Sequence, residues 1–290
     1  MRHITLSDHA GSKVVEAQNA RREEYALATA RYEEKLRARK ERALSLKQSS
    51  HVAWKSGNYG AWMVSLRPRL ALAFEAPPSV PVLRAAGRDE IVWARGSEGE
   101  QAFAEQLGCM LNDDWTLISG YRNHMGEIDK LLVGPSLVLA VEIKFLNGSV
   151  HCKAGRWSRE KFDRYGNRVE AAVPIADKRG RGPDEQVNAP ADVLEKYLDG
   201  RGAGCRIMRA IILTHPQSQV GDVAQGQVDF VTTLHKWDLK TLARGKRAQS
   251  DFDAKHVVNL IRQDHLRRDS NEKRANARRR SGFAGISQSM

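Results

Sequence analysis

The chain has 290 residues, of which 41% are hydrophobic and 28% charged, a size and composition that predict one or two domains and one sizeable core. Its 47 Lys and Arg residues outnumber 35 Asp and Glu residues for a net charge of +12, which favours a polyanionic partner, chiefly nucleic acid, over a merely solvated basic surface. Three scattered cysteines indicate neither a disulfide framework nor a zinc knuckle, and no apolar run could span a membrane, so we expect a soluble, cytoplasmic protein.

The N-terminal part predicts one long helix over residues 13–47, because this stretch contains neither Gly nor Pro and is rich in Ala, Glu, Lys and Arg. Its apolar positions are sparse and do not repeat as sustained heptads, so an exposed arm is favoured over a coiled coil. We therefore assign residues 1–50 to a helical arm, with a helix that binds a protein partner as the alternative.

Residues 51–92 are expected to form an irregular linker, because seven Gly and Pro residues interrupt them. Three aromatic residues of this linker, Trp54, Tyr59 and Trp62, are mixed with basic residues. Such a mixture can stack on bases and hold phosphates, but packing of the rings against the main domain is the interpretation that we prefer.

A compact domain is expected over residues 93–245, followed by a basic helix and tail over residues 246–290. Helix, strands, helix and strands follow one another in the domain, an order that indicates an α/β fold with a mixed sheet. A loop rich in Gly and charge separates its first strands from its second helix, and the tail after residue 268 is expected to lack regular structure. The expected elements are helix 97–111, strands 115–121, 127–133, 137–145 and 149–152, helix 184–199, strands 206–214 and 228–232, helix 235–244 and helix 251–268.

The most informative segment is a predicted β-hairpin over residues 126–144. Two apolar runs flank a Gly-Pro-Ser turn, and a two-residue loop at 135–136 would place Asp129 directly opposite Glu142. A slip of one residue in this register would put the two acids on opposite faces of the hairpin and destroy any site that they form.

Alternation along the two strands predicts two different faces of the hairpin. One face is apolar until its open end, where Asp129, Glu142 and Lys144 gather. The other face, which includes Ile128, is apolar apart from Lys130, and we expect it to pack against a helix.

The two opposed acids predict a metal site. Directly opposed Cβ atoms lie about 4.5–5.5 Å apart, so the carboxylates would repel each other unless a cation lay between them. Mg²⁺ takes oxygen ligands, and the carbonyl of Ile143 offers a further one. Such an ion would polarise a phosphodiester and acidify a bound water, while Lys144 would hold or help deprotonate that water and offset developing charge. The alternative, a strand that ends in an ordinary surface Glu–Lys pair, leaves the opposed Asp129 unexplained.

The hairpin resembles a known family. Gly-Glu-Ile-Asp at 126–129, then an apolar hairpin and Val-Glu-Ile-Lys at 141–144, is similar to the nuclease-related (NERD) domain, a branch of the PD-(D/E)xK nuclease superfamily. Runs at 95–100 and 180–183 also fit this family, and the likeness covers about residues 95–235. It implies a restriction-endonuclease-like αβββαβ core with a mixed sheet, and cleavage of nucleic acid that depends on Mg²⁺ or Mn²⁺.

The resemblance assigns roles to individual residues. Asp129, Glu142 and Lys144 match the D and E-x-K positions, and Gln186 matches a glutamine that could orient the substrate or a metal-bound water. For Gln186, the alternative is a polar residue in the first turn of a helix. Pro190 departs from the pattern, because a proline in the interior of that helix should kink or restart it.

Glu100 matches an acid on the first helix that in relatives often reaches the metal or its water. It could instead close a capping box with Ser97, and Glu98 is the substitute candidate for the acid. The predicted metal ligands are therefore Asp129, Glu142, Glu100 and the carbonyl of Ile143.

Together these features predict a metal-dependent nuclease that acts on DNA more readily than on RNA. The alternative is a non-catalytic nucleic-acid-binding or adaptor module that retains the fold, although neither needs two facing acids near phosphates. A long basic loop over residues 153–181 offers further candidate phosphate contacts, among them Arg181, with a simply solvated loop as the alternative.

Overall fold

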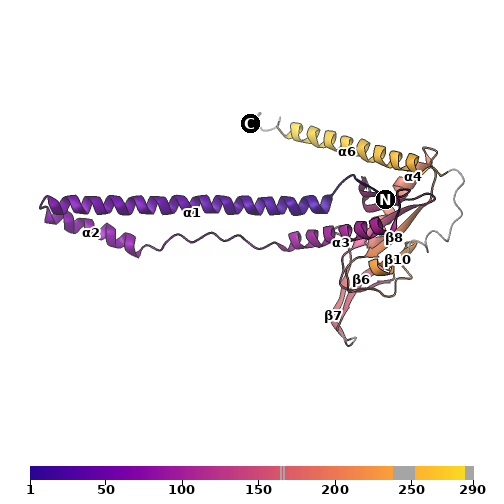
Figure 1. Ribbon diagram of the computed structural model, residues 1–290, viewed down its shortest axis with the longest axis horizontal. Coiled ribbons are helices and arrows are strands. Elements are labelled where there is room, and N and C mark those ends of the chain that lie inside the picture. The colour runs from indigo at the N-terminus through magenta and orange to yellow at the C-terminus, as the bar shows by residue number, and fades with distance from the viewer. Residues whose placement is uncertain (164, 166, 238–251, 285–290) are drawn as a thin grey trace. The chain divides into compact units, whose positions relative to one another are not determined.

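The computed structural model describes residues 1–163, 165, 167–237 and 252–284 of the chain. It divides into two compact units, one of Lys13–Ile91 and the other of Met1–Ser12 with Val92–Met290, and Figure 1 traces their elements. Most of the helix expected at 235–244 lies outside the described residues, which include only a short 3₁₀ turn, η1 (Leu234–Lys236), at its start. Within the described residues, no helix has the length and apolar character needed to cross a membrane.

The smaller unit is helical. Its first helix, α1 (His9–Lys55), is longer at both ends than the expected 13–47. The chain leaves this helix through Gly57, whose φ of +71° is the left-handed conformation in which helices often end. Only three side chains of this unit are buried, so it lacks a hydrophobic core of its own. These side chains are Ser50, Leu72 and Glu90.

A second helix, α2 (Tyr59–Phe74), occupies part of the stretch 51–92, so our expectation of irregular structure was wrong for these residues. Asn58 begins this helix, because its Oδ1 accepts a hydrogen bond from the N–H of Ala61 at 3.0 Å. Pro68 lies inside the helix. The residues that suggested breaks in the chain therefore delimit a helix or are tolerated within it.

The larger unit is built on a six-stranded mixed sheet. Its strands are β1 (Arg2–Thr5), β2 (Thr116–Asn123), β3 (Gly126–Val133), β4 (Val138–Lys144), β8 (Ile207–Leu213) and β10 (Phe230–Thr233). Their order across the sheet is β1-β2-β3-β4-β8-β10. The strands β2, β3 and β4 are antiparallel to one another, and the other neighbouring strands are parallel.

Helices cover both faces of this sheet. On one face, α3 (Arg88–Met110) packs Phe103 and Leu107 against apolar residues of the sheet. On the other face, α4 (Pro183–Asp199) and α6 (Ala254–Ala284) contribute to a second core cluster. The elements α3, β2, β3, β4, α4 and β8 occur in this order in the chain, with strands of a second sheet between β4 and α4, which confirms the αβββαβ core with a mixed sheet.

Two expectations about the helices of this unit were wrong. The helix α4 runs through Pro190 without a restart, and the carbonyl of Pro190 accepts a hydrogen bond from Asn123 Nδ2 at 2.9 Å. The tail continues α6 as far as Ala284, because its sequence is rich in Arg, Lys and Ala, which favour helix.

A second sheet replaces much of the charged loop that we expected. Its strands are β5 (Gly148–Lys153), β6 (Arg156–Phe162), β7 (Arg168–Pro174) and β9 (Ser218–Val220), in the order β7-β6-β5-β9. Figure 1 shows β6 and β7 as a long two-stranded arm. Their charged residues pair across the strands, as Lys161 does with Glu170 at 2.9 Å, so charge is compatible with strand structure here.

Candidate functional site

The register of the β3–β4 hairpin agrees with the one predicted from the sequence. Gly134 N donates to the carbonyl of Leu137 at 2.9 Å, which closes the two-residue loop. The paired residues run from this turn to Lys130 opposite Val141. Asp129 and Glu142 come next, at the open end of the hairpin.

The pleat of β3 is interrupted at Asp129. We expected Ile128 on the face of Lys130, and this was wrong, because Ile128 lies in the core cluster of Leu131 on the other face. The pairing of β2 with β3 skips Asp129 and the opposed Gly120, whose φ is +71°. Glycine adopts this left-handed conformation without strain, so the interruption is a property of the sequence at this position.

Asp129 is held against the next strand. Its Oδ2 accepts a hydrogen bond from the N–H of Ile143 at 2.7 Å. The next residue, Lys144, turns its carbonyl to β8, where it accepts from Thr214 N. Because successive residues of a strand point their backbone groups to opposite sides, the carbonyl of Ile143 points to the side of Asp129.

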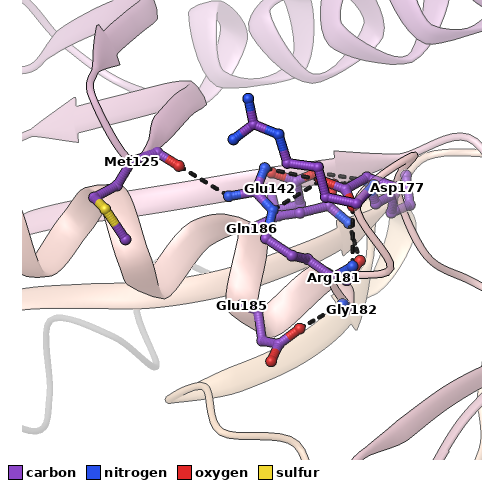
Figure 2. Close-up of polar contacts among 9 residues, drawn as sticks. Met125, Glu142, Asp177, Arg181, Gly182, Glu185 and Gln186 are labelled. Atoms are coloured by element: carbon purple, nitrogen blue, oxygen red, sulfur yellow. Dashed lines mark hydrogen bonds and ion pairs between the residues drawn. The ribbon is translucent and has the colours of Figure 1, made fainter.

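Glu142 and Lys144 form a partly buried pair, and Lys144 also contacts a third group from α4. Lys144 Nζ lies 2.5 Å from Glu142 Oε1 and 2.9 Å from Gln186 Oε1. Gln186 is itself fixed, because its Nε2 donates to the carbonyl of Arg181 at 2.8 Å (Figure 2). The structure therefore brings together three of the predicted site residues, two from β4 and one from the first turns of α4.

Glu100 lies on α3, which covers the face of the sheet opposite to α4. Its Oε2 accepts a hydrogen bond from Lys130 Nζ at 2.5 Å. The capping-box interpretation is wrong, because α3 already begins at Arg88 and Ser97 lies inside it. Glu98, the substitute candidate, has an exposed side chain. Glu100 is thus the acid of this helix that lies near the hairpin.

The acids oppose one another's ionisation. Burial, and then the charge of Glu142, raises the pKa of Asp129 to about 7. Burial also raises the pKa of Glu142, where Lys144 lowers it and Glu100 raises it further. Burial, and then Asp129, raises the pKa of Glu100. A cation among these carboxylates would relieve both their repulsion and their loss of water.

For Lys144, the neighbouring charges favour the charged form, whereas the charged forms of the acids are disfavoured. Burial on its own would lower the pKa of this amine, but the attraction of Glu142 and Asp129 raises it above its ordinary value. The ammonium form is therefore the one that the site stabilises.

The donor chemistry of this site fits a partly hydrated magnesium or manganese ion. Among the residues that the structure describes, no three His, Cys, Asp or Glu side chains converge closely enough to enclose a metal ion. Asp129 and Glu142 nevertheless present two carboxylate groups of the kind that such an ion would bind, and the carbonyl of Ile143 is directed to the side of Asp129. Mg²⁺ usually keeps several waters and needs only one or two protein carboxylates, so a complete protein cage is unnecessary.

Arg181 is a basic loop residue whose charge acts on this constellation. Its Nε donates to Asp177 Oδ2 at 2.8 Å, and its Nη1 donates to the carbonyl of Met125 at 2.9 Å (Figure 2). Its positive charge also lowers the pKa of Glu142. Sequence reasoning named Arg181 only as one of many basic residues and missed Asp177, although the Gly-Arg-Gly-Pro run before α4 was a usable signal.

Other basic residues of the expected loop have different surroundings. Arg159 and Lys161 form ion pairs with Glu170 across β6 and β7. Arg164 lies outside the residues that the structure describes. Lys153 and Arg156 are exposed and form no ion pair in the described part of the chain, so they remain candidate phosphate contacts together with the stretch just before α4.

The comparisons with known proteins support the resemblance that the motifs indicated. Residues 95–214 match the family model of the nuclease-related domain. No curated protein and no solved structure is significantly similar to the chain. The matched segment contains all the predicted site residues, which are Glu100, Asp129, Glu142, Ile143, Lys144 and Gln186.

Proposed function

We propose, from the nuclease-related domain at residues 95–214, that this protein is a metal-dependent nuclease that hydrolyses nucleic acid, with DNA as the preferred substrate. The observation that carries the proposal is the pair of Asp129 and Glu142 beside Lys144 at the open end of the β3–β4 hairpin. Removing an ion from water without full compensation costs roughly several kcal/mol, so the buried Glu142 and the half-buried Asp129 opposite it are costly to the fold unless they bind a cation. We place this activity in the cytoplasm, in keeping with the three free thiols.

In this proposal, Asp129 and Glu142 would hold magnesium or manganese together with the carbonyl of Ile143. The bound ion would polarise the scissile phosphate and acidify a water for in-line attack. Lys144 Nζ, fixed by Glu142 and Gln186, would offset the negative charge that develops on the phosphate. Gln186 would act chiefly by holding this amine in place.

Glu100 would complete the site from α3. Its carboxylate is tethered by Lys130 and feels the charges of both Asp129 and Glu142. We propose that it binds the metal or one of its waters. A non-catalytic module that retains the fold is the second candidate, but its binding of phosphate would be opposed by the same acids.

Incubation with supercoiled plasmid tests the proposal. The wild-type chain should nick or linearise the plasmid with Mg²⁺ or Mn²⁺ and be inactive in EDTA. Glu142→Ala and Lys144→Ala should lower the cleavage rate by at least about 100-fold, because groups that act on the transition state contribute on that scale. Glu105→Ala, which changes an exposed glutamate of α3, is the matched control and should keep full activity.

Equal cleavage by the site variants would refute the assignment of these residues. Tight plasmid binding without cleavage under either ion would favour the non-catalytic module. A parallel assay with RNA of the same length measures substrate preference, and faster RNA cleavage would contradict the proposed preference for DNA.

A further inference from the structure

The helical hairpin, defined as residues 13–75 with α1 and α2, is held together by few contacts. Arg69 Nη1 donates to Ser50 Oγ at 3.2 Å, and Arg39 Nη2 donates to the carbonyl of Leu72 at 3.1 Å. With so little buried between them, the two helices pack loosely and leave space along their junction.

This space forms one continuous groove. Three hollows of about 690, 530 and 470 Å³ follow one another along the hairpin. The first and second share Arg39 and Leu72, and the second and third share Lys47 and Arg69. The shared residues show that the hollows adjoin.

The groove is strongly basic. Seven Lys or Arg residues line it against one acid, Glu75. In the described part of the chain, Arg31, Lys35, Lys40 and Lys47 have neither an ion pair nor a side-chain hydrogen bond, so their charges are available to a ligand. Such a concentration of unpaired cations favours a ligand with several negative charges.

Exposed aromatic rings lie at the end of the groove next to the turn between α1 and α2. The ring centroid of Trp54 lies 5.1 Å from that of Trp62 and 5.5 Å from that of Tyr59. Trp54 and Tyr59 remain 53% and 62% exposed, although both Trp54 and Trp62 line the third hollow. Much of the surface of Trp54 and Tyr59 is therefore available to a ligand.

We propose that this groove is a binding site for single-stranded nucleic acid, separate from the nuclease site. The basic residues would contact phosphates, and the exposed rings would stack on bases. A helical rise of 1.5 Å per residue puts Arg31 about 35 Å from Trp54, a length that spans several nucleotides of a single strand. An acidic protein segment would match the cations but would leave the aromatic cluster without a role.

The binding requires neither metal nor cleavage, so it goes beyond the proposed nuclease function and can fail independently of it. The test is fluorescence anisotropy of the full-length chain with a labelled 15-nucleotide oligothymidine in EDTA, over a range of salt concentrations. The groove variant is Lys35→Gln with Lys47→Gln. The matched control is Arg22→Gln with Arg37→Gln, which removes equal charge from exposed positions of the same helix outside the groove.

We expect the groove variant to lower the slope of log Kd against log salt by about 1.4, since each lost contact to a single strand contributes roughly 0.7. The control should leave this slope unchanged. Tyr59→Ala, at an exposed position, should weaken binding about tenfold, as the loss of one stacked base does. Circular dichroism of each variant checks that the helices remain formed.

Equal slopes for the groove variant and the control would overturn the proposal. Unchanged affinity of Tyr59→Ala would also contradict it. Displacement of the oligonucleotide by polyglutamate at equal charge concentration would show that an acidic protein segment is the better ligand. Plasmid cleavage by the groove variant, measured separately with Mg²⁺, distinguishes loss of this groove from loss of the nuclease site.

Discussion

At the scale of single residues, the candidate site is defined by acids whose charged forms the surrounding residues do not fully stabilise. Burial and the charge of Glu142 raise the pKa of Asp129 more than its hydrogen bond from Ile143 N and the charges of Lys144 and Lys130 lower it. Lys144 forms its ion pair with Glu142. Asp129 is therefore the less fully compensated acid, which makes it the most informative residue to change.

Asp129→Asn should stabilise the metal-free protein while abolishing cleavage. The amide can still accept the hydrogen bond from Ile143 N but carries no charge to be buried or repelled. We expect a gain of about 2 kcal/mol in the free energy of unfolding, or roughly 4–8 °C in Tm, measured by thermal denaturation in EDTA. Mg²⁺ should raise the Tm of the wild type and not that of the variant.

Asp114→Asn, at an exposed position, serves as the control for Asp129→Asn and should change neither Tm nor cleavage. A lower Tm for Asp129→Asn in EDTA would mean that the native site stabilises this carboxylate, and the argument from repulsion would then fail.

At the scale of elements, the helix α6 is joined to the sheet by apolar packing and by a buried carboxylate, that of Asp264. Asp264 Oδ2 accepts from Tyr121 Oη and from Arg268 Nε, both at 2.6 Å. Burial would raise the pKa of Asp264, but these donors and Arg267 together lower it below its ordinary value. A carboxyl group whose pKa is lowered by folding contributes stability above its unfolded pKa, and that stability is lost as the pH falls through the folded value.

Asp264→Asn should therefore destabilise the protein at pH 7 by about 2–3 kcal/mol, because it leaves Arg268 without its counter-charge. The difference from the wild type should shrink as the pH falls below about 4, where the wild-type carboxyl also becomes protonated. Urea denaturation at several pH values measures this, with Tyr121→Phe as a milder comparison. A difference that stays constant down to pH 2 would contradict the assignment of this charge.

The elements that could be predicted from the sequence are those specified by local signals. The β3–β4 hairpin follows from a short turn and alternating apolar residues, and its register alone brings Asp129 opposite Glu142. The strands β6 and β7 were missed because their charged residues are paired with partners on the neighbouring strand. The helix α2 was missed because Gly57 and Pro68 have the composition of a loop.

In the candidate site too, local sequence signals predict some features, whereas others depend on how distant elements pack. The bonds of Lys144 to Gln186 and of Lys130 to Glu100 depend on how α4 and α3 pack on opposite faces of the sheet. No local pattern encodes those distances. The family resemblance supplied the names of Glu100 and Gln186, but only packing defines their partners.

At the scale of the whole molecule, the two units differ in how they are stabilised. The larger unit has three clusters of buried apolar residues, whereas the helical unit of residues 13–91 has almost no buried side chains. Elements with few buried apolar contacts open at low free energy. The two units should therefore not unfold as one cooperative structure.

Native-state hydrogen exchange should show this difference directly. Backbone amides of α1 and α2 should exchange faster by at least about 100-fold than those of β4 and α4, which pack in the core clusters. Leu139→Ala, which removes a fully buried side chain of the sheet, should accelerate exchange in β4 and leave α1 unchanged. Uniform protection over both units would refute this division.

The strand order of the six-stranded sheet has a consequence for how the domain is delimited. The two edge strands, β1 and β10, both lie outside residues 95–214. A fragment trimmed to the matched residues would therefore lose both edge strands of its sheet. In this fragment β2 and β8 would become the edge strands. Both are rich in apolar residues, and their unpaired backbone N–H and C=O groups could pair with strands of other chains. Self-assembly of such a fragment would then result from the loss of β1 and β10 rather than from a property of the full chain.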